Sequence, residues 1–271
     1  MSNVDNISVV IKTFLRPDRV EALIDSIRLF YPTIKIIVVN DGDDQMIWED
    51  ENMRTLLMPF NSGLSAGRNY GVEQCDTEFF VLCDDDFLFN EKTDLVRWRE
   101  LLVKYDMDIM ACRLEKTFAS EEWSWLWYHE DGLIKEKPGH YHAWKDKGFF
   151  VKHVDFVLNS FMARTKSIQD HPWDEKYKKM EHRPYFYKYR NAMRVGWCEE
   201  IEMGHPRKPN PARYNHYRRK DVGSYRQMHK QDGYFFSYET TGSTANDRIS
   251  SVRRKTKGPR SPRARLRNRR E

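Results

Sequence analysis

Short β-branched runs alternate with segments of helical periodicity through the first 116 residues, and this alternation most constrains the fold. The first helical segment begins near Pro17 and repeats apolar side chains at helical spacing as far as Phe30. Strands that alternate with helices favour an α/β fold with a doubly wound, mostly parallel sheet. The expected strands are residues 7–13, 34–39, 54–58, 78–83 and 107–114, and the expected helices are 17–30, 65–74 and 95–105.

Polar clusters follow four of these strands, at residues 12–16, 40–44, 61–68 and 84–86. In an open α/β sheet such loops meet at the carboxyl edge, where ligands bind. The last cluster, Asp84–Asp86, consists of three consecutive acids directly after a buried strand. Because adjacent carboxylates repel one another, a divalent metal with a phosphate-bearing ligand is the expected partner. The alternative is a solvated acidic turn, since acids are common on protein surfaces.

After residue 116 the alternation is lost and aromatic side chains become frequent, particularly between residues 123 and 150. These aromatics could present faces to a sugar or a base, or form the core of a second half-domain. A strand is expected at 154–163, a helix at 181–195 and a last strand at 195–203. The predicted organisation is a first half (1–116), a second half (117–209), an extension (210–251) and a tail (252–271).

The net charge of +5 conceals two unlike parts. Residues 252–271 hold ten Lys and Arg against one acid, whereas the other 251 residues hold 36 basic and 40 acidic side chains. The tail could bind a polyanion, either nucleic acid or an anionic membrane surface. The alternative is a solubilising end, and we expect disorder beyond about residue 240.

Cysteine spacing, hydropathy and the first residues indicate the cellular compartment. The four cysteines have no CxxC spacing, so we expect reduced core residues rather than a zinc site or a disulfide framework. The sequence has no apolar run near 18 residues, and its first residues are polar and unlike a secretory signal. We therefore expect a cytoplasmic protein without a transmembrane segment.

Four ordered motifs resemble the family-2 glycosyltransferases of the GT-A fold. They are a strand with a Thr-containing turn, an Asp-Gly turn after a strand, an Asn-x-Gly-x-x-x-x-Arg-Asn helix start and an Asp-x-Asp. In this chain they occupy residues 7–16, 38–43, 61–69 and 84–86. Three further segments look most like the β-1,4-N-acetylgalactosaminyltransferase branch: 12–16, 58–60 and 154–165. The resemblance covers roughly residues 5–205 and is weaker after 116. It implies a nucleotide-sugar-binding half at 1–116 and an acceptor-binding half at 117–209.

The resemblance implies donor-binding roles for residues at the predicted sheet edge. Asp41 would accept a hydrogen bond from the nucleotide base, and Arg68 would face the nucleotide or its phosphates. Asp84 would lean towards the ribose. The remaining residues expected to bind the donor are Lys12, Thr13, Arg16 and Asp85.

The same resemblance implies a metal cofactor, Mn²⁺ or Mg²⁺, bound by Asp86. Oxygen ligands and a diphosphate suit either ion, which would neutralise charge on the leaving nucleoside diphosphate. His205 is the expected second ligand, because relatives carry a His after the last short strand and such metals also accept imidazole. The alternative for His205 is a surface position before Pro206.

Inverting transfer needs a general base beside the acceptor hydroxyl. The family commonly places this base in an acidic pair at the start of a late helix, and Glu181 is the first candidate here. The next pair, Arg183-Pro184, departs from that pattern, so Asp174 and Asp155 are the runners-up. Charge compensation at a helix N-terminus is the alternative role for Glu181. Acceptor-binding roles are expected for Asp155, Asn159 and Trp173.

The resulting hypothesis is a metal-dependent, inverting glycosyltransferase that moves a sugar from a nucleoside-diphosphate sugar to a glycan or glycoconjugate. One alternative acceptor is a hydroxymethylated base in DNA, which would be flipped out of the duplex. A second alternative is a non-catalytic protein that binds sugar nucleotides or nucleic acid. A nucleotidyltransferase is disfavoured, because residues 12–17 lack the glycine of a phosphate loop.

Overall fold

A computed structural model describes residues 4–115, 125–206, 208–220 and 222–237. The chain divides after Phe236 into two units, and the fold below is that of the first. The aromatic Trp123 and the basic tail at 252–271 lie outside the described residues.

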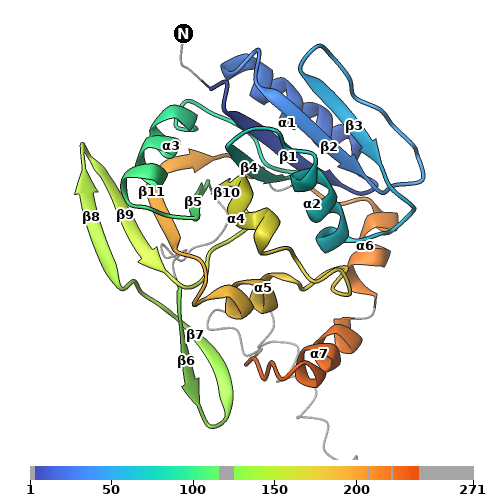
Figure 1. Cartoon of the computed structure of the whole chain (residues 1–271). Coiled ribbons are helices and arrows are strands. Elements are labelled where there is room, and N and C mark those ends of the chain that lie inside the picture. Colours follow the sequence, from blue (N-terminus) through green and yellow to red (C-terminus); the bar gives the residue numbers. More distant parts are fainter. Residues whose placement is uncertain (1–3, 116–124, 207, 221, 238–271) are drawn as a thin grey trace, which may run out of the picture. The chain divides into compact units, whose positions relative to one another are not determined.

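Within the described residues, nine strands form one sheet in the order β3-β2-β1-β4-β10-β5-β11-β9-β8 (Figure 1). Among these nine, β9 and β10 run against the common direction, so the sheet is mostly parallel. A separate hairpin, β6–β7, extends away from the sheet. The strands are β1 (Ile7–Thr13), β2 (Lys35–Asn40), β3 (Met53–Leu57), β4 (Phe79–Asp84), β5 (Ile109–Leu114), β6 (Trp125–Glu130), β7 (Leu133–Pro138), β8 (His142–Asp146), β9 (Phe149–Val154), β10 (Phe161–Arg164) and β11 (Val195–Met203).

Helices cover both faces of the sheet, because the strand side chains alternate between two apolar cores. Val9 and Ile11 face the core that contains α1 and α3, whereas Val10 faces the core that contains α2, α4 and α5. This arrangement confirms the predicted doubly wound α/β fold. The helices are α1 (Pro17–Phe30), α2 (Leu64–Glu73), α3 (Leu95–Lys104), α4 (Thr165–Asp170), α5 (His182–Tyr189), α6 (Ala212–Arg219) and α7 (Val222–Gln231).

Two predicted elements of the second half are wrong in extent. The expected strand at 154–163 is interrupted, because Asp155 and Phe156 donate their backbone N–H groups to Trp125 O. The chain then crosses to β10, which runs in the same direction as β9 but pairs with β4 and β5. The expected helix at 181–195 ends at Tyr189, and a turn leads into β11.

The aromatic-rich segment folds as two β-hairpins, which the periodicity did not predict. Asp131-Gly132 joins β6 to β7 and Lys147-Gly148 joins β8 to β9, and all four residues have positive φ. Two-residue turns of this kind match the twist of the strands and favour Asp-Gly in particular. Asp131-Gly132 is therefore a sequence signal that could have predicted the first hairpin.

The carboxyl ends of β1, β2 and β4 meet at one edge, where these strands pair in parallel register. β11 also ends at this edge, at Met203, because it runs parallel to β5. All four cysteines are buried and unpaired, as expected for reduced core residues. In the described part of the chain, no helix combines the length and apolar character needed to cross a bilayer.

Candidate active site

A cavity of about 330 Å³ lies at the carboxyl edge of the sheet. Its walls come from the ends of β1, β2 and β4, the start of α2, the segment before α5, and α6. We call it the edge pocket. It is lined by Lys12, Thr13, Phe14, Arg16, Asp41, Asn61, Gly63, Leu64, Asp84, Asp85, Lys178, Lys179, Met180, Tyr214, Tyr217 and Arg218.

Asp41 links two walls of the edge pocket. Its carboxylate forms an ion pair with Lys12 and accepts a hydrogen bond of 2.8 Å from Gly63 N. Gly63 has a φ of +103°, and a Cβ on Gly67 would lie 2.2 Å from Lys12 Cε. Gly63 and Gly67, both in the 61–69 segment, thus allow α2 to begin against the Lys12–Asp41 ion pair. Burial lowers the pKa of Lys12, although the charge of Asp41 opposes that shift.

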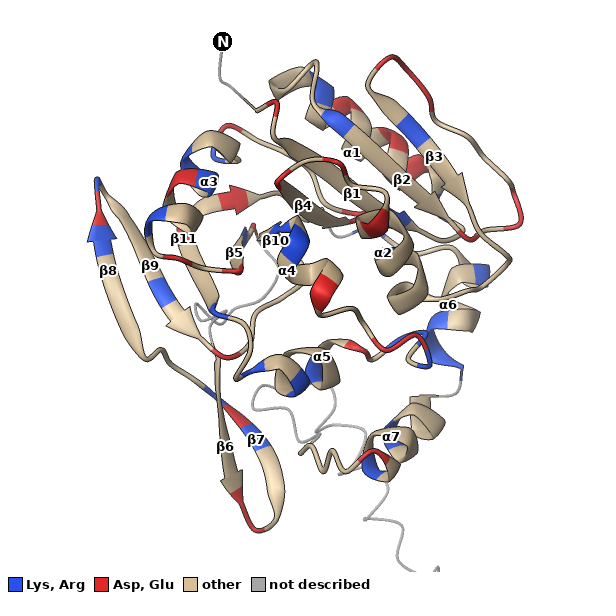
Figure 2. Cartoon of the chain, viewed as in Figure 1, with Lys and Arg blue, Asp and Glu red and all other residues tan. Residues whose placement is uncertain are grey.

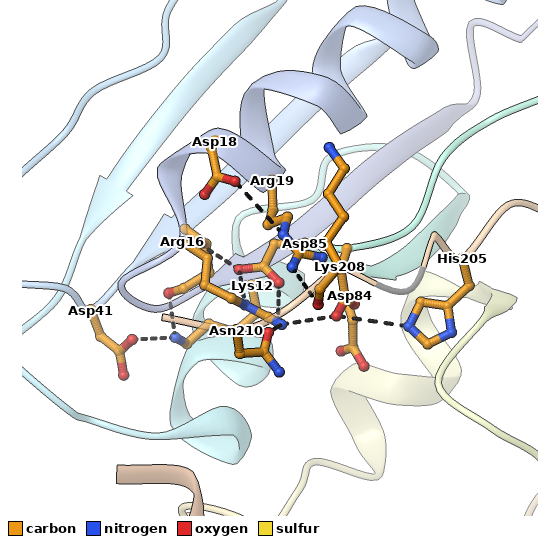
Figure 3. A network of polar contacts seen from close by, with 12 residues as sticks. Lys12, Arg16, Asp18, Arg19, Asp41, Asp84, Asp85, His205, Lys208 and Asn210 are labelled. Carbon is orange, nitrogen blue, oxygen red and sulfur yellow. Dashed lines mark hydrogen bonds and ion pairs between the residues drawn. The ribbon is translucent and has the colours of Figure 1, made fainter. Parts of the chain in front are cut away.

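Arg16 lies between two carboxylates of the acidic triplet (Figure 3). It forms an ion pair with Asp85, and its NH1 donates to Asp86 Oδ2 at 2.8 Å. Thr13 Oγ1 also donates to Asp85, at 2.7 Å. Asp85 is therefore buried against the β1–α1 loop, and burial raises its pKa to about 6 although Arg16 opposes the shift.

Arg68 is fully buried and joins Asp84 to α5. Its NH2 donates to Asp84 Oδ1 at 3.0 Å, and its NH1 pairs with Glu181. The Asn159 amide, oriented with its oxygen towards Arg68, accepts from both guanidinium NH groups (3.1 and 2.9 Å) and donates to His182 Nδ1 at 2.7 Å. Burial alone would raise the pKa of Glu181, but the positive charge of Arg68 lowers it below its usual value.

Asp86 and His205 face each other across the ends of β4 and β11. Asp86 Oδ2 and His205 Nε2 are 3.7 Å apart, so a cation at about 2.1 Å from each could lie between them. The described residues contain no group of three or more His, Cys, Asp or Glu arranged to hold a metal. One carboxylate and one imidazole nevertheless fit Mn²⁺ or Mg²⁺ when diphosphate oxygens and water supply the other ligands.

Three predicted site residues lie away from the edge pocket. Asp174 is partly exposed and 3.1 Å from Lys176 Nζ. Trp173 is buried and stacks on Tyr185 with ring centroids 4.6 Å apart. Asp155 lies in a separate cavity beside Tyr141. The other predicted donor residues line the edge pocket, except the buried Arg68, which binds Asp84. Asp86 and His205 lie beside the pocket, where Asp86 binds Arg16. Glu181 and Asn159 lie behind Arg68.

Helix α6 forms one wall of the edge pocket, a contribution that the sequence patterns did not predict. Arg16 lies 4.1 Å from the ring centroid of Tyr214. Tyr217 contacts Phe14 and Phe60, with centroids 5.5 and 5.4 Å away. Figure 2 marks the basic residues of this helix, of which Arg218 lines the pocket. The sequence does contain a signal for this helix. Pro211 marks its start, and Tyr214 and Tyr217 follow with a spacing that places both rings on one face.

Residues 8–178 match the family described as Glycosyl transferase family 2. The chain belongs to this family. It is similar to β-1,4 N-acetylgalactosaminyltransferase 1 of Rattus norvegicus, with 31% identity over 256 residues, covering 88% of this chain and 48% of the relative. The Homo sapiens protein of that name is 32% identical over 211 residues, covering 74% and 39%. β-1,4 N-acetylgalactosaminyltransferase 2 of Mus musculus is 27% identical over 200 residues, covering 73% and 39%.

The chain spans about half the length of these relatives, or less. Among solved structures, S. aureus TarS matches with a TM-score of 0.54 and 14% identity, covering 75% of this chain and 37% of TarS. Its fragment 1–349 matches with a TM-score of 0.50 and 16% identity, covering 72% and 60%. These matches confirm the predicted GT-A-type fold, and the family match confirms the recognised family.

Proposed function

We propose that this protein is a metal-dependent, inverting glycosyltransferase that moves a sugar from a UDP-sugar to a hydroxyl of a glycan or glycoconjugate. The observation that carries the proposal is the edge pocket, which brings Lys12 and Arg16 together with Asp84 and Asp85 at the carboxyl ends of parallel strands. Asp86 lies beside it, paired with Arg16. Such edges bind nucleotides in open α/β sheets. The relatives named N-acetylgalactosaminyltransferases support sugar transfer and make UDP-N-acetylgalactosamine the first donor to test.

The pocket offers separate groups for the base and the diphosphate. Phe14 and Tyr217 present aromatic faces on which a nucleobase could stack. Asp41 would accept a hydrogen bond from the base. Lys12 and Arg16, now paired with carboxylates, would hold the phosphates, because a guanidinium fork matches phosphate oxygens.

Asp86 and His205 would hold the metal, and Asp84 would lie beside the ribose. A bound Mn²⁺ or Mg²⁺ would neutralise the charge that grows on the leaving diphosphate. Arg68 would fix the Asp84 carboxylate, since its guanidinium is itself held by Glu181 and Asn159.

Inversion requires one group to remove the proton of the acceptor hydroxyl as the sugar moves. Glu181 remains the first candidate, and Asp174 and Asp155 remain the runners-up. To act as a base, Glu181 would have to release Arg68, which lowers its pKa. We favour a glycan acceptor over DNA, because the similar proteins are named β-1,4 N-acetylgalactosaminyltransferases, and a β-1,4 linkage joins the transferred sugar to a sugar hydroxyl.

The test is release of free nucleoside diphosphate from a panel of sugar nucleotides with Mn²⁺, for the wild type, Asp86→Ala and His205→Ala. We expect selective, metal-dependent release, which Asp86→Ala reduces about a hundredfold or more. Asp170→Ala is the matched control, because this exposed acid on α4 pairs only with Lys166 among the described residues. Binding without release, with or without acceptor glycans, would favour the non-catalytic alternative. No binding of any sugar nucleotide would refute the proposal.

A further inference from the structure

A second cavity, of about 320 Å³, lies between the β6–β7 hairpin, β9 and the end of α5. We call it the hairpin cavity. It combines aromatic rings with charged and polar groups, and its principal lining residues are Trp127, Tyr141, His153, Asp155, Tyr187 and Arg190. The donor role proposed above uses none of these side chains.

Asp155 is held rigidly in the wall of the hairpin cavity. Its Oδ2 accepts hydrogen bonds of 2.8 Å from both Trp127 N and Tyr141 OH. Among the described residues no partner contacts Oδ1. A carboxylate oxygen has two lone pairs, so Asp155 can accept a further hydrogen bond from a ligand hydroxyl.

The aromatic residues of the cavity present both apolar faces and polar edges. Tyr141 is 52% exposed. The Arg190 guanidinium lies 3.9 Å from the Tyr187 ring centroid, and Tyr187 OH is 3.0 Å from His129 Nε2. A sugar ring presents C–H groups on its faces and hydroxyls around its rim. The aromatic rings of the cavity could pack against the C–H groups, while the carboxylate and the guanidinium form hydrogen bonds with the hydroxyls.

Two elements connect the hairpin cavity to the edge pocket. The loop before β10 has Asp155 in the cavity and Asn159 against Arg68. Helix α5 begins beside Arg68 at Glu181 and brings Tyr187 to the cavity. From residue 182 to residue 187 the helix rises about 8 Å over five steps, so a short oligosaccharide could span the distance from Arg68 to the cavity.

We propose that the hairpin cavity is a second acceptor subsite, which binds a sugar residue of the acceptor glycan other than the one that receives the transferred sugar. This inference rests on the proposed function, because it requires the edge pocket to bind a sugar nucleotide. It accounts for the fixed carboxylate and the exposed ring of Tyr141 in a cavity whose lining shares no residue with the edge pocket.

The test starts with an array of defined mono- to hexasaccharides, probed with the whole protein in the presence of UDP and Mn²⁺. The glycan that binds best and its truncated forms are then titrated by calorimetry into the wild type, Tyr141→Ala and Arg190→Ala. We expect both variants to weaken binding of the full glycan about tenfold while they leave the shortest bound fragment within twofold. Tyr141→Phe, which retains the ring and loses the hydroxyl, should fall between the wild type and Tyr141→Ala.

Phe150→Ala is the matched control, because Phe150 is an exposed aromatic on β9 that does not line the cavity. Thermal unfolding of every variant shows whether it is folded. Binding of UDP without binding of any saccharide, or preferential binding of nucleic acid, would overturn the subsite and leave the donor site intact. Equal losses for full and truncated glycans would also overturn it. Failure to bind any sugar nucleotide would refute the proposed function itself.

Discussion

The guanidinium group of Arg68 forms an ion pair with Glu181, 113 positions later in the chain. The other arm of the same group donates to Asp84 at 3.0 Å. One buried cation on α2 therefore connects the acidic triplet after β4 to the start of α5. This connection places Glu181, the first candidate for the general base, in contact with residues that we expect to bind the donor. Its carboxylate is charged and already paired with Arg68.

Replacement of Glu181 by Gln should lower the free energy of unfolding by about 3 kcal/mol, because it leaves the buried Arg68 with Asp84 as its single carboxylate partner. Urea denaturation measures this change. The control is Glu136→Gln, which breaks a more exposed pair with Arg183 and should change stability by about 1 kcal/mol or less. A Glu181→Gln protein of unchanged stability that has lost only sugar transfer would instead identify Glu181 as the base.

The stability of the protein should fall between pH 6.5 and pH 4 because of His182. Burial lowers the pKa of this imidazole to about 4. In the unfolded chain His182 binds a proton below about pH 6.5, whereas the folded protein keeps it neutral, so protons favour unfolding across this interval. The expected contribution is about 3 kcal/mol, lost as the pH falls.

His182→Phe should remove this part of the pH dependence, since a phenyl ring can pack between Phe156 and Phe186 without a titrating group. The measurement is urea denaturation of both proteins at pH 7 and pH 4.5. If the difference in free energy of unfolding between the two proteins is the same at both pH values, His182 does not cause the pH dependence.

Gly63→Ala should destabilise the protein by about 3 kcal/mol or more, because the residue has a φ of +103° and its new Cβ would lie 2.6 Å from Lys178 Cα. Gly132→Ala separates the two effects, since Gly132 has a φ of +73° with open space around it. Its expected loss is about 1 kcal/mol, from backbone strain alone. Thermal or urea unfolding of both variants would show equal losses if the contact with Lys178 were unimportant.

Tyr217→Ala should weaken binding of UDP about tenfold, because it removes one of the aromatic faces offered to the base by the edge pocket. Calorimetric titration of UDP in the presence of Mn²⁺ gives the dissociation constant. Tyr128→Ala, on the β6–β7 hairpin, removes a ring of the same size outside the edge pocket and should bind UDP like the wild type. An unchanged affinity in Tyr217→Ala would show that α6 does not contribute to the nucleotide site.

Local sequence patterns determined the first half of the fold, up to about residue 116. Every expected strand and helix before residue 116 is present within a few residues, because period, proline placement and turn residues act over a few positions. The Asp94 cap of α3 is a clear case, since its side chain accepts a hydrogen bond from the backbone N–H of Arg97. The same patterns also predicted that the polar clusters meet, because parallel strands must end at a common edge.

Only the tertiary structure decided which charged groups are paired and which side chains face a cavity. Asp85 is adjacent to Asp84 and Asp86 in the sequence, yet of the three it alone is buried, against Thr13 and Arg16. Trp173 was expected to bind the acceptor, but its side chain is buried and stacks on Tyr185 in the core. These outcomes depend on contacts between residues that are distant in the chain. The free energy of such contacts cannot be predicted from local hydrophobic periodicity. For the same reason, the wall formed by α6 and the cavity around Asp155 became visible only in the folded chain.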